Sequence, residues 1–244
     1  MSQTVERGLS ILDFLADGPK SLAQVARHLS VHKSTASRLL QTLESQGFVR
    51  HDAKHLYRLG PRLFGLAFRA LDNLDVRSSA ASHLRRLGEL TGQTIHLGSL
   101  DGGEVLYIDK YESSQSVRMY SRIGAQAPLF CTGVAKAILA YRPERERRET
   151  AERITYIAHT RRTIVTPGAF LTELERIRAR GYAIDDREHE EFIHCIAAPI
   201  RTPDGEVTHA LSISTTTVSL SRKQLLGLVT PLLQTVAEIE QELT

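Results

Sequence analysis

The chain has 244 residues, enough for one large domain or for two small ones that each bury a core. Its hydrophobic fraction of 41% and charged fraction of 24% are those of a soluble globular protein. Two cysteines, Cys131 and Cys195, are too few for a disulfide framework, and no uninterrupted apolar run is long enough to span a bilayer. The polar N-terminus lacks the pattern of a signal peptide, so we expect a cytoplasmic protein without a membrane partner.

The net charge of +3 is unevenly distributed along the chain. Residues 1–70 hold ten Lys or Arg against five Asp or Glu, a net charge of +5, and residues 71–244 are left with −2. A basic segment ahead of a mildly acidic body indicates that this segment binds an anion. Nucleic acid is the usual candidate for that anion.

The basic segment has the element order of a winged helix-turn-helix. Apolar residues at helical spacing predict a first helix that stops before Gly18-Pro19, a second that Ser21 caps, and a third that ends at Gly47. Residues 48–59 predict two short strands joined by a polar tip, which spans 51–55. In a winged helix-turn-helix the second helix of the pair lies in the major groove of DNA.

The outer face of the third helix carries polar and basic side chains, and no acid precedes Glu44. Hydroxyl groups can hold phosphates, while Arg38 and Gln41 have the reach and donor geometry to read base edges. We expect DNA contacts from Lys33, Ser34, Thr35, Ser37, Arg38, Gln41 and Thr42, and from Arg50 and Lys54 in the hairpin. The alternative is that this face is only the solvated polar side of a three-helix core. Three features argue against that alternative: the capped preceding helix, the turn length and the basic hairpin tip. His32 stands where a Ser or Thr cap is usual, which leaves the helix start open by one residue.

A helical linker is predicted next. Apolar residues recur at helical spacing between Pro61 and Leu74, and a second amphipathic run ends at Gly92 after a polar break over 72–79. The stripe on this linker can bury against a sister subunit, which predicts a homodimer. We therefore divide the chain into a DNA-binding domain over 1–60, a linker over 61–79 and an effector-binding domain over 80–244.

The body alternates strands and helices in an α+β pattern. Two hairpins are predicted, over 94–109 around Asp101-Gly102-Gly103 and over 195–214 around Pro203-Asp204-Gly205. A further strand is expected over 117–123. Helices are expected over 133–141, 142–154 and 170–180, with a single last helix from Leu225 to Ile239.

An enzyme is the competing interpretation of the body. Cys195, His194, His189 and Asp185 are close in sequence, but neighbours on a strand point to opposite faces, so Cys195 and His194 cannot share one site. The acidic run 185–191 lacks a second ligand cluster for a metal, and a solvated loop is its expected fate. We expect neither a catalytic site nor a metal or other cofactor. The alternative left open is a metabolite-binding or cysteine-dependent enzyme acting on a small keto acid, in which the head mediates protein contacts.

The chain resembles the IclR family of bacterial transcription regulators over nearly its full length. The strings "LAQVARHLSVHKSTASRLLQTLESQGFVR" and "YRLG" carry the resemblance in the head, and "RMYSRIGAQAPLFCTGVAKAILA", "RGYAIDDREHEEFIHCIAAPI" and "ALSIS" carry it in the body. Within the family, "RMYSRIG" followed by "APLFCTG" looks most like the regulators of ketodeoxygluconate and related sugar-acid catabolism. Arg201 and Thr202 depart from the family pattern, which usually places an aromatic residue or His and then Asp or Asn there.

The resemblance implies a GAF-like effector domain with a curved, mostly antiparallel sheet, dimers joined through the heads and often tetramers joined through the bodies. It implies a repressor of a catabolic operon that binds double-stranded operator DNA and a small carboxylic or keto acid, similar to 2-keto-3-deoxygluconate. The implied effector contacts are Met119, Ala127, Gly133, Val134, Asp185, Cys195, Ser212 and Ser214. Ser212 and Ser214 alternate onto one face of their strand, and Asp185 would accept a hydrogen bond from a ligand hydroxyl.

Overall fold

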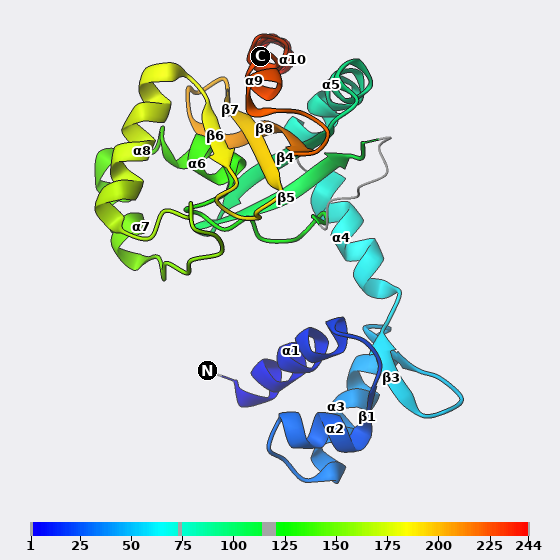
Figure 1. Ribbon diagram of the computed structural model, residues 1–244. Coiled ribbons are helices and arrows are strands. Elements are labelled where there is room, and N and C mark those ends of the chain that lie inside the picture. Colours follow the sequence, from blue (N-terminus) through cyan, green and yellow to red (C-terminus); the bar gives the residue numbers. More distant parts are fainter. Residues whose placement is uncertain (1, 73–74, 114–120, 244) are drawn as a thin grey trace. The chain divides into compact units, whose positions relative to one another are not determined.

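The computed structural model describes residues 2–72, 75–113 and 121–243. The chain forms two compact units, residues 1–73 and residues 74–244, which are coloured blue to cyan and cyan to red in Figure 1. Each unit has its own buried core.

The N-terminal unit is built from helices and a small antiparallel sheet with the strand order β1-β3-β2. Its elements are α1 (Gln3–Ala16), β1 (Lys20–Ser21), α2 (Leu22–His28), α3 (Lys33–Ser45), β2 (Val49–His51), β3 (Leu56–Leu59) and α4 (Arg62–Asp72). Ile11, Val25, Ala36 and Leu40 are fully buried between the first three helices. The helix-turn-helix and the β2–β3 wing expected from the sequence are confirmed.

Local chemistry explains where these helices begin and end. Ser21 and Gln24 form both hydrogen bonds of a capping box at the start of α2. His32 itself caps α3, because its Nδ1 accepts a hydrogen bond from the backbone N–H of Ser34, so α3 begins at Lys33. Gly47 follows the end of α3 with a φ of +74°, a conformation that glycine adopts without the strain a side chain would bring.

The C-terminal unit has a five-stranded antiparallel sheet with the order β5-β4-β8-β7-β6. Its elements are α5 (Asp75–Thr91), β4 (Thr94–Asp101), β5 (Glu104–Tyr111), α6 (Gly133–Leu139), α7 (Glu144–Arg153), α8 (Pro167–Arg180), β6 (Ala183–Asp186), β7 (Ile193–Arg201), β8 (Val207–Thr216), α9 (Arg222–Leu226) and α10 (Val229–Glu242). Helices α5 and α10 pack together on one side of the sheet, whereas α6 lies against the other side with α8 and α7 beyond it (Figure 1). The expected α+β class is confirmed.

Two expectations about the body are corrected, and a third lies mainly outside the described residues. The single last helix is two helices, because the chain breaks between Leu226 and Val229 and Ser221 starts α9 with its own capping box. The acidic run over 185–191 is only partly a solvated loop: Glu190 and Glu191 are exposed, but Asp185 lies in β6 and both Asp185 and Glu188 are buried. The strand expected over 117–123 lies mainly outside the described residues, and its described part, 121–123, is not a strand.

In the described ranges no helix combines the length and the apolar character needed to cross a membrane.

Candidate functional site

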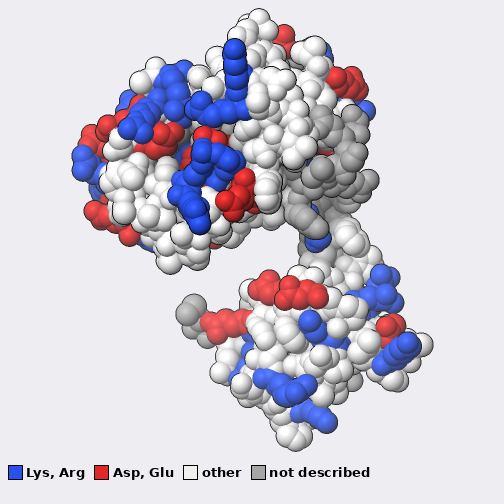
Figure 2. All heavy atoms as spheres, viewed as in Figure 1, with Lys and Arg blue, Asp and Glu red and all other residues white. Residues whose placement is uncertain are grey.

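The outer face of α3 presents the polar side chains that the sequence singled out. Lys33, Ser34, Arg38, Gln41 and Thr42 are exposed, and Thr35 and Ser37 are half-buried. Ala36 and Leu40 anchor the opposite face in the core of the unit. In Figure 2 the acidic side chains visible on this unit gather mainly along α1, and basic ones are spread over α2, α3 and the wing. This face can therefore bind a polyanion without electrostatic repulsion from a row of carboxylates.

The wing is held against α3 by one acidic side chain. The Glu44 carboxylate accepts hydrogen bonds from the His51 ring, at 2.6 Å from Nδ1, and from the His51 backbone N–H at 3.2 Å. Glu44, the first acid after the helix start, thus points to the wing. Arg50 and Lys54 remain exposed on the wing, where they can contact the phosphate backbone.

A second candidate site is a hollow of about 200 Å³ in the C-terminal unit, between α6 and the sheet. The described residues lining it are His96, Tyr107, Ser121, Ala125, Gln126, Thr132, Gly133, Val134, Asp185, His189, Glu190, Ile193, Cys195, Ser212 and Ser214. We call this hollow the sheet pocket. It brings together six of the eight residues expected to contact an effector.

Strand register explains why residues distant in sequence meet in the sheet pocket. Ser214 on β8 pairs with Cys195 on β7, and Cys195 pairs with Asp185 on β6, so the three form one row across the sheet. Ser212 lies two residues from Ser214 and pairs with His96 on β4. Residues two apart on a strand share a face, which places both serines in the same hollow.

The start of α6 forms the wall of the sheet pocket that faces the strands. A Cβ atom added at Gly133 would lie 2.5 Å from the Cys195 Sγ and 3.2 Å from the Cβ of Ala197. Only glycine allows the helix to approach the sheet this closely without a shift of one or the other. Gly133 therefore sets the depth of the pocket.

Asp185 is an ionisable group of this site whose pKa is brought close to neutral pH by its surroundings. It is 4% exposed, and its Oδ1 accepts a hydrogen bond of 2.7 Å from the Glu188 backbone N–H. Burial raises the pKa of Asp185 to about 7, despite the opposing effect of the nearby Lys136 ammonium. A carboxyl group that keeps its proton near neutral pH can donate a hydrogen bond to an acidic ligand.

A buried ion pair beside Asp185 was missed by the sequence analysis. Lys136 is fully buried, and its Nζ donates to the Glu188 carboxylate at 2.6 Å and to the Ile184 carbonyl at 2.7 Å. The signal available in the sequence was a single lysine inside the apolar helix "GVAKAIL". Its ammonium bonds Glu188, which leaves the sheet pocket without a Lys or Arg among its described lining residues.

Two aromatic residues of the sheet pocket were also missed. His96 is 3% exposed and contacts Ser121 Oγ at 2.7 Å and Ser214 Oγ at 3.3 Å. Burial lowers the pKa of His96 to about 3, so its ring is neutral at ordinary pH. The Tyr107 ring lies 4.9 Å from the His96 ring, between centroids. The pocket therefore offers neutral rather than cationic hydrogen-bond donors.

The cysteine of the sheet pocket is unsuited to nucleophilic chemistry. Cys195 is 6% exposed, and burial raises the pKa of its thiol to about 12. His194 points away from this pocket and contacts the Leu220 carbonyl through Nε2 at 3.0 Å. A thiol needs a nearby base or a lowered pKa to act as a nucleophile, and Cys195 has a raised one.

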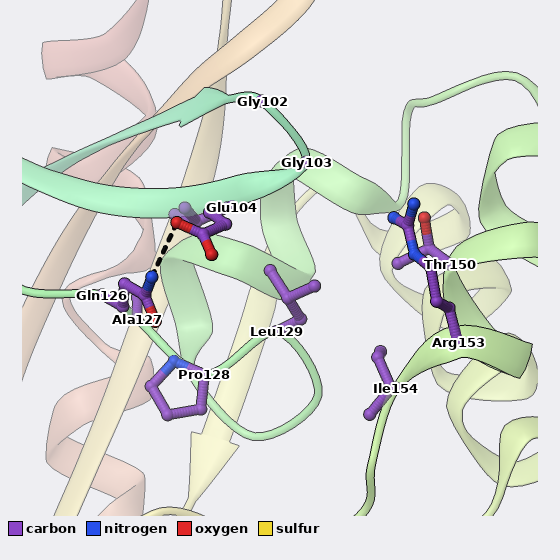
Figure 3. A pocket seen from close by; sticks show the side chains of 11 residues that line it. Gly102, Gly103, Glu104, Gln126, Ala127, Pro128, Leu129, Thr150, Arg153 and Ile154 are labelled. Carbon is purple, nitrogen blue, oxygen red and sulfur yellow. Dashed lines mark hydrogen bonds between the residues drawn. The ribbon is translucent and has the colours of Figure 1, made fainter. Parts of the chain in front are cut away.

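The two remaining expected effector contacts are not among the described residues that line the sheet pocket. Met119 lies outside the described residues. Ala127 lines a separate hollow of about 370 Å³, which Figure 3 shows between the 102–104 turn, the 126–129 segment and α7. There Gln126 donates a 2.6 Å hydrogen bond to Glu104, and Arg153 and Thr150 lie across the hollow from this pair (Figure 3). Apart from Ala127, none of the expected effector contacts that the structure describes lines this hollow.

Two family models match successive parts of the chain. The model of the IclR helix-turn-helix domain matches residues 4–53, and that of the C-terminal domain of bacterial IclR transcriptional regulators matches residues 68–241. The HTH-type transcriptional regulator KdgR of Escherichia coli K12 is 39% identical over 205 residues, which cover 84% of this chain and 78% of KdgR. The HTH-type transcriptional repressor AllR of the same strain is 32% identical over 216 residues, covering 87% and 80%.

A solved structure supports the fold across both units. The crystal structure of the Thermotoga maritima IclR superposes with a TM-score of 0.82 at 33% sequence identity and covers 98% of each chain. With this fold, the exposed recognition helix and the two family domains, the chain belongs to the IclR family of bacterial transcriptional regulators and is a helix-turn-helix DNA-binding regulator.

Proposed function

We propose that this regulator is a repressor of a catabolic operon and responds to a small carboxylic or keto acid held in the sheet pocket. The observation that carries the proposal is the convergence of Asp185, Cys195, Ser212 and Ser214 from three strands on one buried hollow beneath α6. The resemblance of residues 118–133 to regulators of sugar-acid catabolism favours an effector similar to 2-keto-3-deoxygluconate. Met119 and Ala127 belong to the proposed contact set by that resemblance alone.

The donors of the sheet pocket suit a short polar acid. Hydroxyl groups of Ser212 and Ser214 can bond a carboxylate or hydroxyl of the ligand, and protonated Asp185 can donate to it. The backbone of Gly133 and Val134 and the Cys195 thiol complete the walls. A hollow of about 200 Å³ favours a small ligand over a large one.

A thermal-shift screen tests the effector proposal. A ligand that binds only the native protein raises its melting temperature by mass action. We expect 2-keto-3-deoxygluconate or a related keto acid to raise it in the wild type and to lose this effect in Ser212→Ala. Ser82→Ala, which removes an exposed hydroxyl from α5, is the matched control and should keep the effect. Equal shifts in both variants would place the ligand elsewhere.

The head is proposed to bind a pseudo-palindromic operator through the α3 face and the wing. The proposed contacts are Lys33, Ser34, Thr35, Ser37, Arg38, Gln41, Thr42, Arg50 and Lys54. We expect Arg38→Ala to weaken operator binding by roughly 1–3 kcal/mol, because an arginine that reads a base contributes about that much. A gel-shift titration at fixed salt measures the change. Arg145→Ala removes the same charge from an exposed position on α7 and should bind like the wild type; equal affinity of the two variants would exclude Arg38 from the reading face.

Repression predicts the direction of the effector response. The relative AllR is named a repressor, which supports the same sign here. In the gel shift, the keto acid that raises the melting temperature should release the operator from the wild type and not from Ser212→Ala. Tighter operator binding in the presence of the acid would indicate the opposite sign.

A dimer joined through the head and the adjacent linker is proposed as the DNA-binding form, with tetramers formed through the bodies. Large apolar side chains are exposed on α1 and α4, namely Val5, Leu9, Phe64, Leu66 and Phe68. Burial of such a surface against a second copy removes apolar area from water. The domain limits 1–60, 61–79 and 80–244 remain part of this proposal.

A further inference from the structure

A hollow of about 490 Å³ lies in the C-terminal unit where the start of α7 meets α8 and the turn between β7 and β8. Its lining residues are Tyr141, Arg142, Pro143, Glu144, Arg147, Arg178, Arg201, Asp204, Gly205, Glu206 and Val207. None of them lines the sheet pocket or the hollow of Figure 3. We call this hollow the arginine pocket, because four of its lining residues are arginines.

Arg147 is the feature of the arginine pocket that requires an explanation. Its residue is 6% exposed, and its Nε is the one buried side-chain nitrogen or oxygen in the described part of the chain that lacks a hydrogen-bond partner. No described residue forms an ion pair with its guanidinium. Burial of a charged group without a partner is costly, so the unpartnered Nε of this largely buried arginine favours an anion as its partner.

The carboxylates around Arg147 have other partners. Glu144 binds Arg148 at 2.7 Å, and Glu206 binds Arg142 at 3.0 Å. Asp204 accepts a hydrogen bond from the Thr202 hydroxyl. None of the three lining carboxylates is therefore bound to Arg147. The Arg147 charge is only one of the smaller causes that lower the pKa of Glu144.

Two further cations face the same hollow without a carboxylate partner among the described residues. Arg178 is exposed on α8, and the Arg201 guanidinium lies 4.7 Å above the centre of the Tyr141 ring. The first turn of α7 also borders the hollow, and its cap residue Pro143 offers no side-chain bond to the free N–H groups. Guanidinium forks and helix N-termini both bind oxyanions.

We propose that the arginine pocket binds a small oxyanion, a phosphate or carboxylate group, with Arg147 as its central ligand and Arg178 and Arg201 at its rim. The anion supplies the partner that the buried guanidinium lacks. This site is separate from the sheet pocket, so the regulator has two places for small anionic molecules.

Isothermal titration of the full chain in phosphate-free buffer tests the site, with inorganic phosphate and acetate as two separate probes at matched ionic strength. We expect one of the probes to bind saturably to the wild type and at least about tenfold more weakly to Arg147→Met, which keeps the stem and removes the donors. Arg145→Ala, on the exposed side of the same helix, should bind like the wild type. The probe that binds identifies phosphate or carboxylate as the preferred group.

Two controls keep the result decisive. Without an anion, Arg147→Met should melt at or above the wild-type temperature, because it removes an unpaired buried charge. Arg178→Ala changes an exposed rim residue and should weaken binding of the same probe severalfold without loss of fold. Absence of saturable binding, or equal affinity of the wild type and both pocket variants, would overturn the proposal.

Discussion

Asp185 illustrates how a single residue couples the sheet pocket to the stability of the fold. Its pKa is raised from 3.8 to about 7 by burial, with Lys136 acting in the opposite direction. Between about pH 4 and pH 7 the native state therefore holds a proton that the unfolded chain has released. The protonated group stabilises the native state below that interval, and this contribution is lost as the pH rises through it.

We predict that Asp185→Asn removes this pH dependence. Relative to the variant, the wild type should lose about 3 kcal/mol of unfolding free energy between pH 5 and pH 8. Urea denaturation of both proteins at the two pH values measures the difference. Burial lowers the pKa of His96 to about 3 and that of His209 to about 4. Both histidines are present in the two proteins, so their contributions to the pH dependence of stability cancel in the comparison. A constant difference between the proteins would contradict the raised pKa.

Gly133 gives a second prediction at the residue scale. Gly133→Ala places a Cβ atom 2.5 Å from the Cys195 Sγ and should cost about 1–3 kcal/mol of unfolding free energy through overpacking. Addition of Cys195→Ala should restore at least half of the loss, since it removes the contacted sulfur. Gly168→Ala, in open space on α8, is the matched control and should leave stability unchanged or higher. No rescue in the double variant would show that Ala197 limits the space instead.

At the scale of elements, a polar side-chain contact links the recognition helix to the wing, in addition to the core packing of Val49 against α3. Glu44 on α3 bonds both the ring and the backbone N–H of His51 on β2. The wing is a short hairpin whose tip is exposed, so this contact adds to the order that Val49 and the strand pairing supply.

We therefore predict that Glu44→Ala loosens the wing without unfolding the head. The amide of His51 should exchange its hydrogen at least several times faster, as measured by hydrogen exchange with mass spectrometry or NMR. Glu6→Ala on α1 removes an exposed acid that bonds no described side chain and should leave wing exchange unchanged. Equal exchange in both variants would mean that the strand pairing of β2 and β3 alone orders the wing.

The helices and hairpins of the chain follow from local sequence signals, but their breaks do not always do so. The apolar spacing from Leu225 to Ile239 is continuous, and it predicted one helix. The structure separates α9 from α10, and Pro231 stands in the first turn of α10, where proline is tolerated. Periodicity alone does not report such a break, since both helices present apolar residues to the same sheet side.

At the scale of the whole molecule, the apolar side chains on α1 and α4 determine the expected assembly. Phe64 and Phe68 are 65% and 60% exposed within a single chain. Exposed aromatic residues on one helix are typical of a subunit interface. The proposed head-to-head dimer would cover them and present two recognition helices to the two halves of an operator.

We predict that Phe68→Glu weakens this dimer and, with it, operator binding. Sedimentation analysis at micromolar concentration should show a shift towards monomer, and the gel shift should show at least tenfold weaker binding, because each half-site then binds alone. Ile157→Glu, at a comparably exposed apolar residue of the C-terminal unit, should keep the dimer and the operator affinity. A dimer that persists in Phe68→Glu would place the interface elsewhere.

Local residue order determined much about this protein. The capping box at Ser21, the apolar face of α3 and the turns at 101–103 and 203–205 act over a few residues, so the helix-turn-helix, the wing and both hairpins could be predicted. The effector-contact residues were expected only from the family resemblance, because no spacing rule relates positions that lie so far apart in the sequence.

Only the tertiary structure decided the electrostatics of the site. The acidic run over 185–191 looked solvated, yet strand pairing with β7 buries Asp185 and brings Glu188 to the ammonium of Lys136. The same packing leaves Arg147 buried without a partner in a helix whose sequence suggests only a charged surface. Charge state and pairing depend on desolvation and on neighbours distant in sequence, and these exist only after the sheet and its helices have assembled.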